Sequence, residues 1–208
     1  SFLTSITLPN SLTSIGGGAF DLCTSLTSIT LPDSLLSIGG NPFTSCDNLT
    51  QIQVSPDHPM LVTTNGVLFN KAEKKLICYP CAFMQESYAV PCGVTRIGQN
   101  AFYECRYLTS ITLPSSLTSI GKLAFAGCKS LTRIILPSSL TSIGSWAFAG
   151  CESLTSITLP DSLTTIEAWT FSGCESLASI TLPGSLTSIG NWAFAGCKSL
   201  TSITLPNS

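Results

Sequence analysis

Cysteine is the residue type with the greatest chemical potential in this chain, which holds ten cysteines and a single histidine. Three cysteines, Cys78, Cys81 and Cys92, lie outside any regular pattern. The other seven each stand three residues after a phenylalanine: Cys23, Cys46, Cys105, Cys128, Cys151, Cys174 and Cys197. Thiols can bind zinc, form disulfides or act as nucleophiles, so the two groups need separate interpretations.

The three irregular cysteines leave several interpretations open. Cys78 and Cys81 form a CxxC motif, but there is no second one, so a zinc site would have to combine them with Cys92 and His58. A disulfide between Cys81 and Cys92 would tie this segment to the next one. Three free thiols are the simplest alternative. We favour the two interpretations without a metal and expect no metal site.

Patterns typical of other catalytic sites are missing from the sequence. His58 stands alone in Pro-Asp-His-Pro, no serine has a nucleophile-elbow context, and no glycine-rich stretch has phosphate-loop spacing. Asp33 and Asp161 fall in turn sequences, where carboxylates bond nearby amides. We therefore expect no enzyme activity and no cofactor.

Two sets of residues could instead form binding surfaces. Trp146, Trp169 and Trp192 recur every 23 residues, so their indoles should form a row. Such a row suits contact with a protein or a glycan, although each indole could simply shield a neighbouring turn. Arg133 and Ile135 interrupt a regular series of serine and threonine pairs, and we expect them to mark a secondary site.

The 23-residue spacing also governs the rest of the chain. The stretch Leu154 to Ser176 returns with few changes from Leu108, Leu131 and Leu177. Within it, Ile157 and Leu159 alternate with hydroxyl residues, which predicts a strand that ends at a proline. A second short extended segment follows, and then a helical or 3₁₀ turn that carries phenylalanine and cysteine. A unit this short must bury its apolar residues against its neighbours, which predicts a solenoid.

The period breaks once, and the break predicts an inserted β-hairpin at about residues 55–90. Gly66 to Asn70 and Lys75 to Pro80 resemble two strands joined by a polar turn. We expect this hairpin to project from a single array that covers residues 1–208. Both ends lie within a repeat, so we expect a fragment of a longer chain whose uncapped ends could associate end to end.

The repeat resembles the BspA-like, or treponemal, type of leucine-rich repeat, with the form LxxIxLPxxLxxIGxxAFxxC. The pattern starts at Leu3, Leu26, Leu49, Leu108, Leu131, Leu154, Leu177 and Leu200. The segments GVLFNK and LIxYP of the insertion are similar to segments found beside such repeats. The resemblance implies a right-handed, curved solenoid with parallel strands. It also implies a secreted or surface-attached protein that binds other molecules, and buried, reduced thiols at the seven regular cysteines.

Composition narrows the class of partner. The formal net charge is −2 and no basic stripe is visible, which argues against nucleic acid. No apolar run is long enough to insert into a membrane. We therefore predict a non-catalytic adhesion module, extracellular or at the cell surface, that binds a protein or glycan. An ice-binding solenoid that uses the serine and threonine face, or a purely structural spacer, is the alternative.

Overall fold

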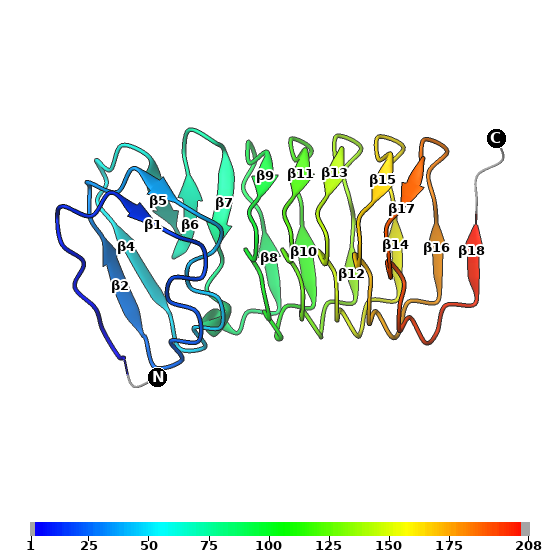
Figure 1. Cartoon of the computed structure of the whole chain (residues 1–208), viewed down its shortest axis with the longest axis horizontal. Helices are drawn as coiled ribbons and strands as arrows, with labels where there is room; N and C mark the ends of the chain where they lie inside the picture. Colours follow the sequence, from blue (N-terminus) through cyan, green and yellow to red (C-terminus); the bar gives the residue numbers. More distant parts are fainter. Residues whose placement is uncertain (1–2, 205–208) are drawn as a thin grey trace.

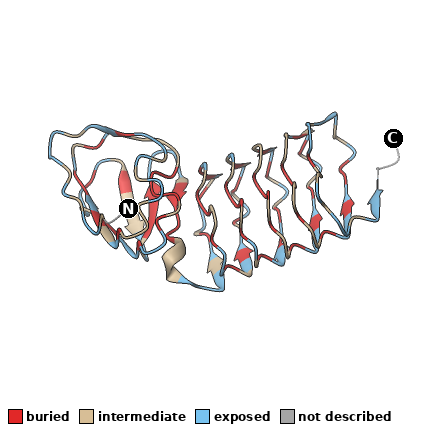
Figure 2. Cartoon of the chain, turned by 60° about the horizontal axis from the view of Figure 1, so that its bottom comes forward, coloured by how far each residue is buried: buried red, intermediate tan, exposed pale blue. Residues whose placement is uncertain are grey.

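A computed structural model describes residues 3–204, and in it the coils stack side by side along one axis as a parallel β-solenoid (Figure 1). Each regular coil contains a first strand, a turn, a short second strand and a turn segment that leads to the next coil. Buried residues line the inside of the coils (Figure 2). The predicted solenoid is confirmed.

The first strands form two parallel ladders. One ladder pairs β2 (Ser28–Leu31) with β4 (Gln51–Val54), and the other holds β8 (Ser87–Ala89), β10 (Ser110–Thr112), β12 (Arg133–Ile134), β14 (Ser156–Thr158), β16 (Ser179–Thr181) and β18 (Ser202–Thr204). Equivalent residues pair directly, as Ile157 does with Ile180. Both isoleucines are buried and the flanking hydroxyl residues are exposed, because successive side chains of a strand point to opposite faces.

One predicted strand position is wrong. Ile6 lies in no strand and is only half-buried. The amide of Thr27 still donates to the carbonyl of Thr4, at 3.3 Å, so contact between these two coils exists just before Ile6. The strand pairing does not extend from Thr4 to Ile6.

The second short segments of the coils also form parallel ladders, which the sequence indicated only as extended chain. Two-stranded ladders join β1 (Ser14–Ile15) to β3 (Ser37–Ile38) and β15 (Thr165–Ile166) to β17 (Ser188–Ile189). Between them lies a six-stranded sheet in the order β13 (Ser142–Ile143), β11 (Ser119–Ile120), β9 (Arg96–Ile97), β7 (Lys75–Cys78), β6 (Val67–Asn70) and β5 (Leu61–Thr64).

A turn lies around each repeat phenylalanine, as expected, with a bond such as that from the Cys128 amide to the Phe125 carbonyl at 3.2 Å, but it does not extend into a helix. These segments are hydrogen-bonded turns, and within residues 3–204 the only helical element is the 3₁₀ helix η1 (Cys81–Phe83). Alternate amides donate to the next coil instead, as Phe125 does to Ala147 and Gly127 does to Ala149, both at 2.8 Å. A helix would need those amides for its own bonds. No helix in the described range is long and apolar enough to cross a membrane.

The phenylalanines form a continuous stack through the core. Phe125, Phe148 and Phe171 are fully buried, as predicted, and their rings lie nearly parallel with centroids 5.4 and 5.6 Å apart. Tyr79 of the insertion extends the same stack, 5.0 Å from Phe102. The insertion therefore contributes to the core and takes a phenylalanine position within it.

The predicted hairpin exists, but its expected projection from the solenoid is wrong. β6 pairs antiparallel with β5 and β7, and β7 continues parallel to β9 in the same sheet. All four residues of β6 are buried. Leu68 packs with the core of the N-terminal coils, whereas Val67 and Phe69 pack with the core of the later coils. A strand that buries both faces cannot project into solvent, so the hairpin lies between the two cores and packs against both.

Candidate binding surface

The three predicted indoles form one stacked column on the turn segments that follow β13, β15 and β17. The ring centroids of Trp146 and Trp169 are 4.5 Å apart and those of Trp169 and Trp192 are 5.4 Å apart, with interplanar angles of 8° and 15°. Trp146 and Trp169 are half-buried, and Trp192 is 65% exposed. The column predicted from the sequence is therefore present.

The backbone at this column is left-handed at every rung. The φ angles of Trp146, Trp169 and Trp192 are 62°, 61° and 59°, and Leu123 and Asn100, which precede them in the column, both have 57°. This conformation costs a non-glycine residue about 1–2 kcal/mol. Bonds to the next coil hold it in place, as where the amide of Trp146 donates to Ala168 at 3.1 Å.

Stacking limits what the column can offer a ligand. Nearly parallel rings at these separations cover the faces that they turn toward each other. The indole edges remain for contact, and an edge carries the positive part of the ring quadrupole and the N–H donor. The column is therefore suited to ligand groups that accept hydrogen bonds at its edge, rather than to groups that slide between the rings.

The structure places Arg133 and Ile135 on a different surface, at an opening in the first ladder. β12 spans two residues, and only Arg133 pairs with β14, whereas β14 and β16 share three pairs. Ile135 is 66% exposed. A hollow of 330 Å³ lies here, lined by Arg133, Ile134, Ile135, Leu136, Ser156, Ile157 and Thr158. No tryptophan lines it, so the structure gives two separate candidate surfaces.

Most of the regular cysteines are structural, as predicted. Cys46, Cys128, Cys151 and Cys174 are free and buried, and Cys23 and Cys197 are free and half-buried. The thiol of Cys151 donates to the carbonyl of Phe125 in the preceding coil at 3.2 Å, and four further thiols of the column make the same bond. Burial raises the pKa of the Cys128 thiol to about 12. A thiol that stays protonated is a poor nucleophile and metal ligand.

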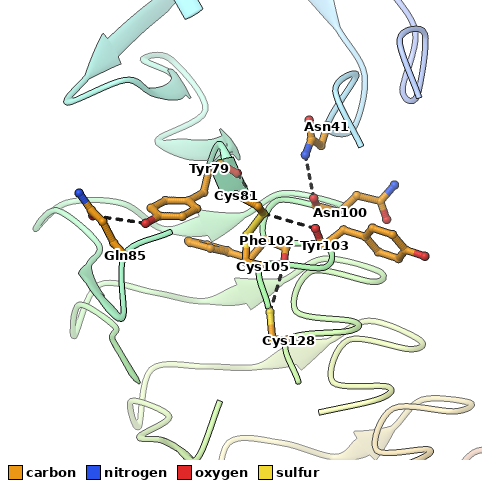
Figure 3. Close-up of a disulfide and its surroundings, with 9 residues drawn as sticks. All are labelled: Asn41, Tyr79, Cys81, Gln85, Asn100, Phe102, Tyr103, Cys105 and Cys128. Atoms are coloured by element: carbon orange, nitrogen blue, oxygen red, sulfur yellow. Dashed lines mark hydrogen bonds between the residues drawn. A yellow bond between two sulfur atoms is a disulfide. The ribbon is translucent and has the colours of Figure 1, made fainter. Parts of the chain in front are cut away.

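The predicted disulfide between Cys81 and Cys92 is wrong, and so is the expectation that Cys105 is reduced. Cys81 pairs with Cys105, with Cα atoms 4.7 Å apart, and Cys92 is an exposed free thiol (Figure 3). Parallel Cα–Cβ vectors keep the Cβ atoms of equivalent positions in neighbouring coils farther apart than a disulfide allows. Cys81 and Cys105 are 24 residues apart, one more than the repeat, so they are not equivalent. The signal in the sequence was Tyr79, which lies 23 residues before Phe102 and sets the phase of Cys81.

The zinc interpretation finds no support in the geometry. No group of three or more histidine, cysteine or acidic residues is arranged to hold a metal among residues 3–204. Cys78 and His58 are both buried, whereas Cys92 is exposed. The Nδ1 atom of His58 accepts the amides of Met60 and Leu61, both at 3.1 Å, so this histidine shapes the turn before β5.

Comparison with known proteins identifies the repeat. The model of the BspA type leucine-rich repeat region matches residues 1–72 and 86–208, which is most of the chain. The chain belongs to this family. The match omits only part of the insertion, where β7 and η1 lie. A search of curated proteins finds no match.

Solved structures of bacterial proteins are similar along nearly the whole chain. A leucine-rich cell surface protein from Faecalibacterium prausnitzii is 36% identical, with a TM-score of 0.85, over 97% of this chain and 53% of its own. The pneumococcal vaccine antigen PcpA is 28% identical, with a TM-score of 0.83, over 100% of this chain and 57% of its own. The chain thus spans about half the length of these structures.

Proposed function

We propose that this chain is a non-catalytic, adhesive binding module of a bacterial protein that is secreted or held at the cell surface, with a protein or glycan as ligand. Its membership of the BspA type repeat family supports a binding role. The cell-surface protein from F. prausnitzii supports the location. The repeat thiols act as core residues of a scaffold, since they donate to backbone carbonyls of the preceding coil.

The observation that carries the proposal is the tryptophan column. Its three indoles are stacked in one row on a left-handed backbone, with Trp146 and Trp169 half-buried and Trp192 65% exposed. Indoles are among the residues that contribute most binding energy in interfaces. Arg133 and Ile135 would add a smaller, separate contact on the strand face.

The test compares binding and stability of the same variants. We expect Trp146→Ser combined with Trp169→Ser to weaken binding to immobilised mucin or basement-membrane extract. An anchoring indole contributes about 2 kcal/mol, so the loss should be at least about 30-fold and should approach about 1,000-fold if both indoles are anchors. Surface plasmon resonance measures the binding and a melting curve establishes that the variant is folded at the assay temperature.

Tyr107→Ser is the matched control, since Tyr107 is an exposed aromatic residue outside the column. If the tryptophan variants lose stability but bind as the wild type does, the indoles are shields and the contact proposal is wrong. If the wild type binds neither surface, the spacer interpretation replaces it.

The ice-binding alternative needs an unbroken row of hydroxyls. Arg133 and Ile135 interrupt the exposed row between Thr112 and Thr158, and the ladder opens at that point. This irregularity favours ligand binding over a match to a lattice. Thermal hysteresis in a dilute solution of the protein would reverse that preference.

A further inference from the structure

A hollow of 680 Å³ lies where the N-terminal coils meet the coils that follow the insertion. It is separate from the tryptophans and from Arg133 and Ile135, none of which lines it. Its polar and aromatic walls come from turn segments on both sides of the junction: Asp21, Ser45, Asn100, Tyr103 and Glu104. Its volume falls within the range of about 300–1,000 Å³ that is typical of small-ligand sites.

The hollow exists because the insertion takes over bonds that would otherwise close the surface. In the regular array, alternate amides of one turn segment donate to the next coil, as Leu123 does to Ser145 and Phe125 does to Ala147. At the junction, Asn41 donates to Gln99 at 2.9 Å, but the next such bond, to Ala101, comes from Tyr79 of the insertion. The N-terminal turn segment is therefore bonded at Asn41 to the segment that contains Gln99, and the two segments separate after that residue.

One residue of the lining, Asn100, carries a buried acceptor without a partner. Asn100 Oδ1 is buried and accepts no hydrogen bond from the described residues, although the backbone carbonyl of Asn100 accepts the Asn41 side-chain amide at 3.0 Å. The side chains of Asn100 and Tyr103 extend to the same side, away from the disulfide (Figure 3). Leaving a buried acceptor unpaired costs about 1–3 kcal/mol, so the Asn100 side chain gains this free energy if it turns its oxygen toward a ligand hydroxyl in the hollow.

Charge narrows the class of ligand. The lining contains the carboxylates of Asp21 and Glu104 and no lysine, arginine or histidine, so an anion would be repelled. Arg106 already pairs with Glu104 at 3.0 Å, and only the Asp21 carboxylate lacks an ion pair among the lining residues described. Burial and then the charges of Glu104 and Asp21 raise the pKa of Tyr103, so its phenol stays a neutral donor.

We propose that this hollow is a binding site for a neutral oligosaccharide. Sugar hydroxyls both donate and accept, so they can pair with the Asp21 carboxylate, the unpaired Asn100 oxygen and the Tyr103 phenol together. The Tyr103 ring supplies an apolar surface with a polar tip, which suits a sugar that has both characters. The hollow adjoins the N-terminal end of the tryptophan column, since Asn100 and Leu123 line it, but no tryptophan does, so either proposal can fail without the other.

The experiment titrates the purified chain with five probes by isothermal calorimetry. Three are neutral trisaccharides, namely cellotriose, maltotriose and chitotriose, and two are charged contrasts, namely a heparin tetrasaccharide and hexalysine. We expect at least one neutral trisaccharide to bind. Asp21→Asn and Asn100→Gly should each weaken that binding at least tenfold. Glycine keeps the left-handed backbone of position 100 and the carbonyl that Asn41 bonds, so the variant removes the side chain alone.

Asp161→Asn serves as the matched control, because it makes the same change at an exposed carboxylate outside the hollow, and it should leave trisaccharide binding unchanged. A melting curve checks that each variant is folded. Failure of all three neutral trisaccharides to bind overturns the proposal. Trisaccharide binding that is unchanged in both Asp21→Asn and Asn100→Gly also overturns it. Tighter binding of hexalysine than of every trisaccharide would show a site for a cationic peptide and would also overturn it.

Discussion

The coils after Val94 and the coils around the insertion are held together in different ways. In the later coils each contact recurs by translation, so that Phe125, Phe148 and Phe171 stack alike and the thiols of Cys151 and Cys174 make identical bonds. Around the insertion each contact occurs once. Repetition gives the array stability that is shared by many rungs, whereas the irregular junction creates a surface found nowhere else along the described chain.

The junction relies on polar and covalent links where the array relies on stacking. Asn41 is buried; its side-chain amide donates to the Asn100 carbonyl, and its oxygen accepts the Phe43 amide at 2.9 Å. The disulfide then fastens η1 to the coil of Cys105. A coil that departs from the period cannot pair fully with the ladders of its neighbours, so it needs stabilising contacts of its own. Predictions can therefore target the stacking in the array and the disulfide at the junction separately.

The largest effect is expected from breaking the aromatic stack inside the array. Phe148→Ala should lower the free energy of unfolding by about 3–5 kcal/mol, because it opens a cavity between two fully buried rings. Urea unfolding followed by circular dichroism measures the loss. Phe194→Ala is the matched variant, since Phe194 is only half-buried and stacks on Phe171. Equal losses for the two variants would contradict the idea that stability depends on neighbours on both sides.

A smaller effect is expected from breaking the covalent link at the junction. Replacing both Cys81 and Cys105 with serine should cost about 3 kcal/mol, because the bond closes a loop of 24 residues in the unfolded chain. Urea midpoints with and without reductant measure it, and reductant should leave the double variant unchanged. Hydrogen exchange should rise around η1 and remain low at β14 and β16. Uniform loss of protection would show that the link is not local to the junction.

The regular coils could be predicted from the sequence almost completely, because one period fixes strands, buried isoleucines and the phenylalanine stack together. Positions such as Ile157 and Phe148 need only local pattern and the requirement to stack. The turn segments could not be predicted in the same way. Phe171 and Cys174 have helical spacing, but alternate amides of their segment bond to the next coil, a tertiary choice that spacing does not encode.

The junction was the least predictable part. The hairpin was visible as two strand-like runs joined by a polar turn, but burial of both faces of the strand at Leu68 depends on cores that lie on either side. The same applies to the hollow beside Asn100, which arises from the bonds that Tyr79 takes over. The tryptophan column was predicted because it shares the period, and its stacked geometry follows from the left-handed backbone at each rung.

The last prediction compares the free thiols of the array with the bonded pair of the junction at alkaline pH. Burial raises the pKa of Cys128 to about 12, whereas a thiol in an unfolded chain ionises near about 8.5. The raised pKa means that the stabilisation from this thiol is complete below about pH 8.5 and is lost as the pH rises toward 12. One such thiol should therefore cost about 2 kcal/mol between pH 8 and pH 10. Cys81 and Cys105 have no thiol to ionise, so they add nothing to this dependence of stability on pH.

Urea midpoints at pH 7, 8, 9 and 10 for the wild type and Cys128→Ala measure the effect of the Cys128 thiol. We expect the gap between the two proteins to narrow by about 2 kcal/mol across pH 8–10. Parallel stability curves would show that the Cys128 thiol ionises as easily in the folded protein as in the unfolded chain, and would contradict its role as a buried, protonated donor to Phe102.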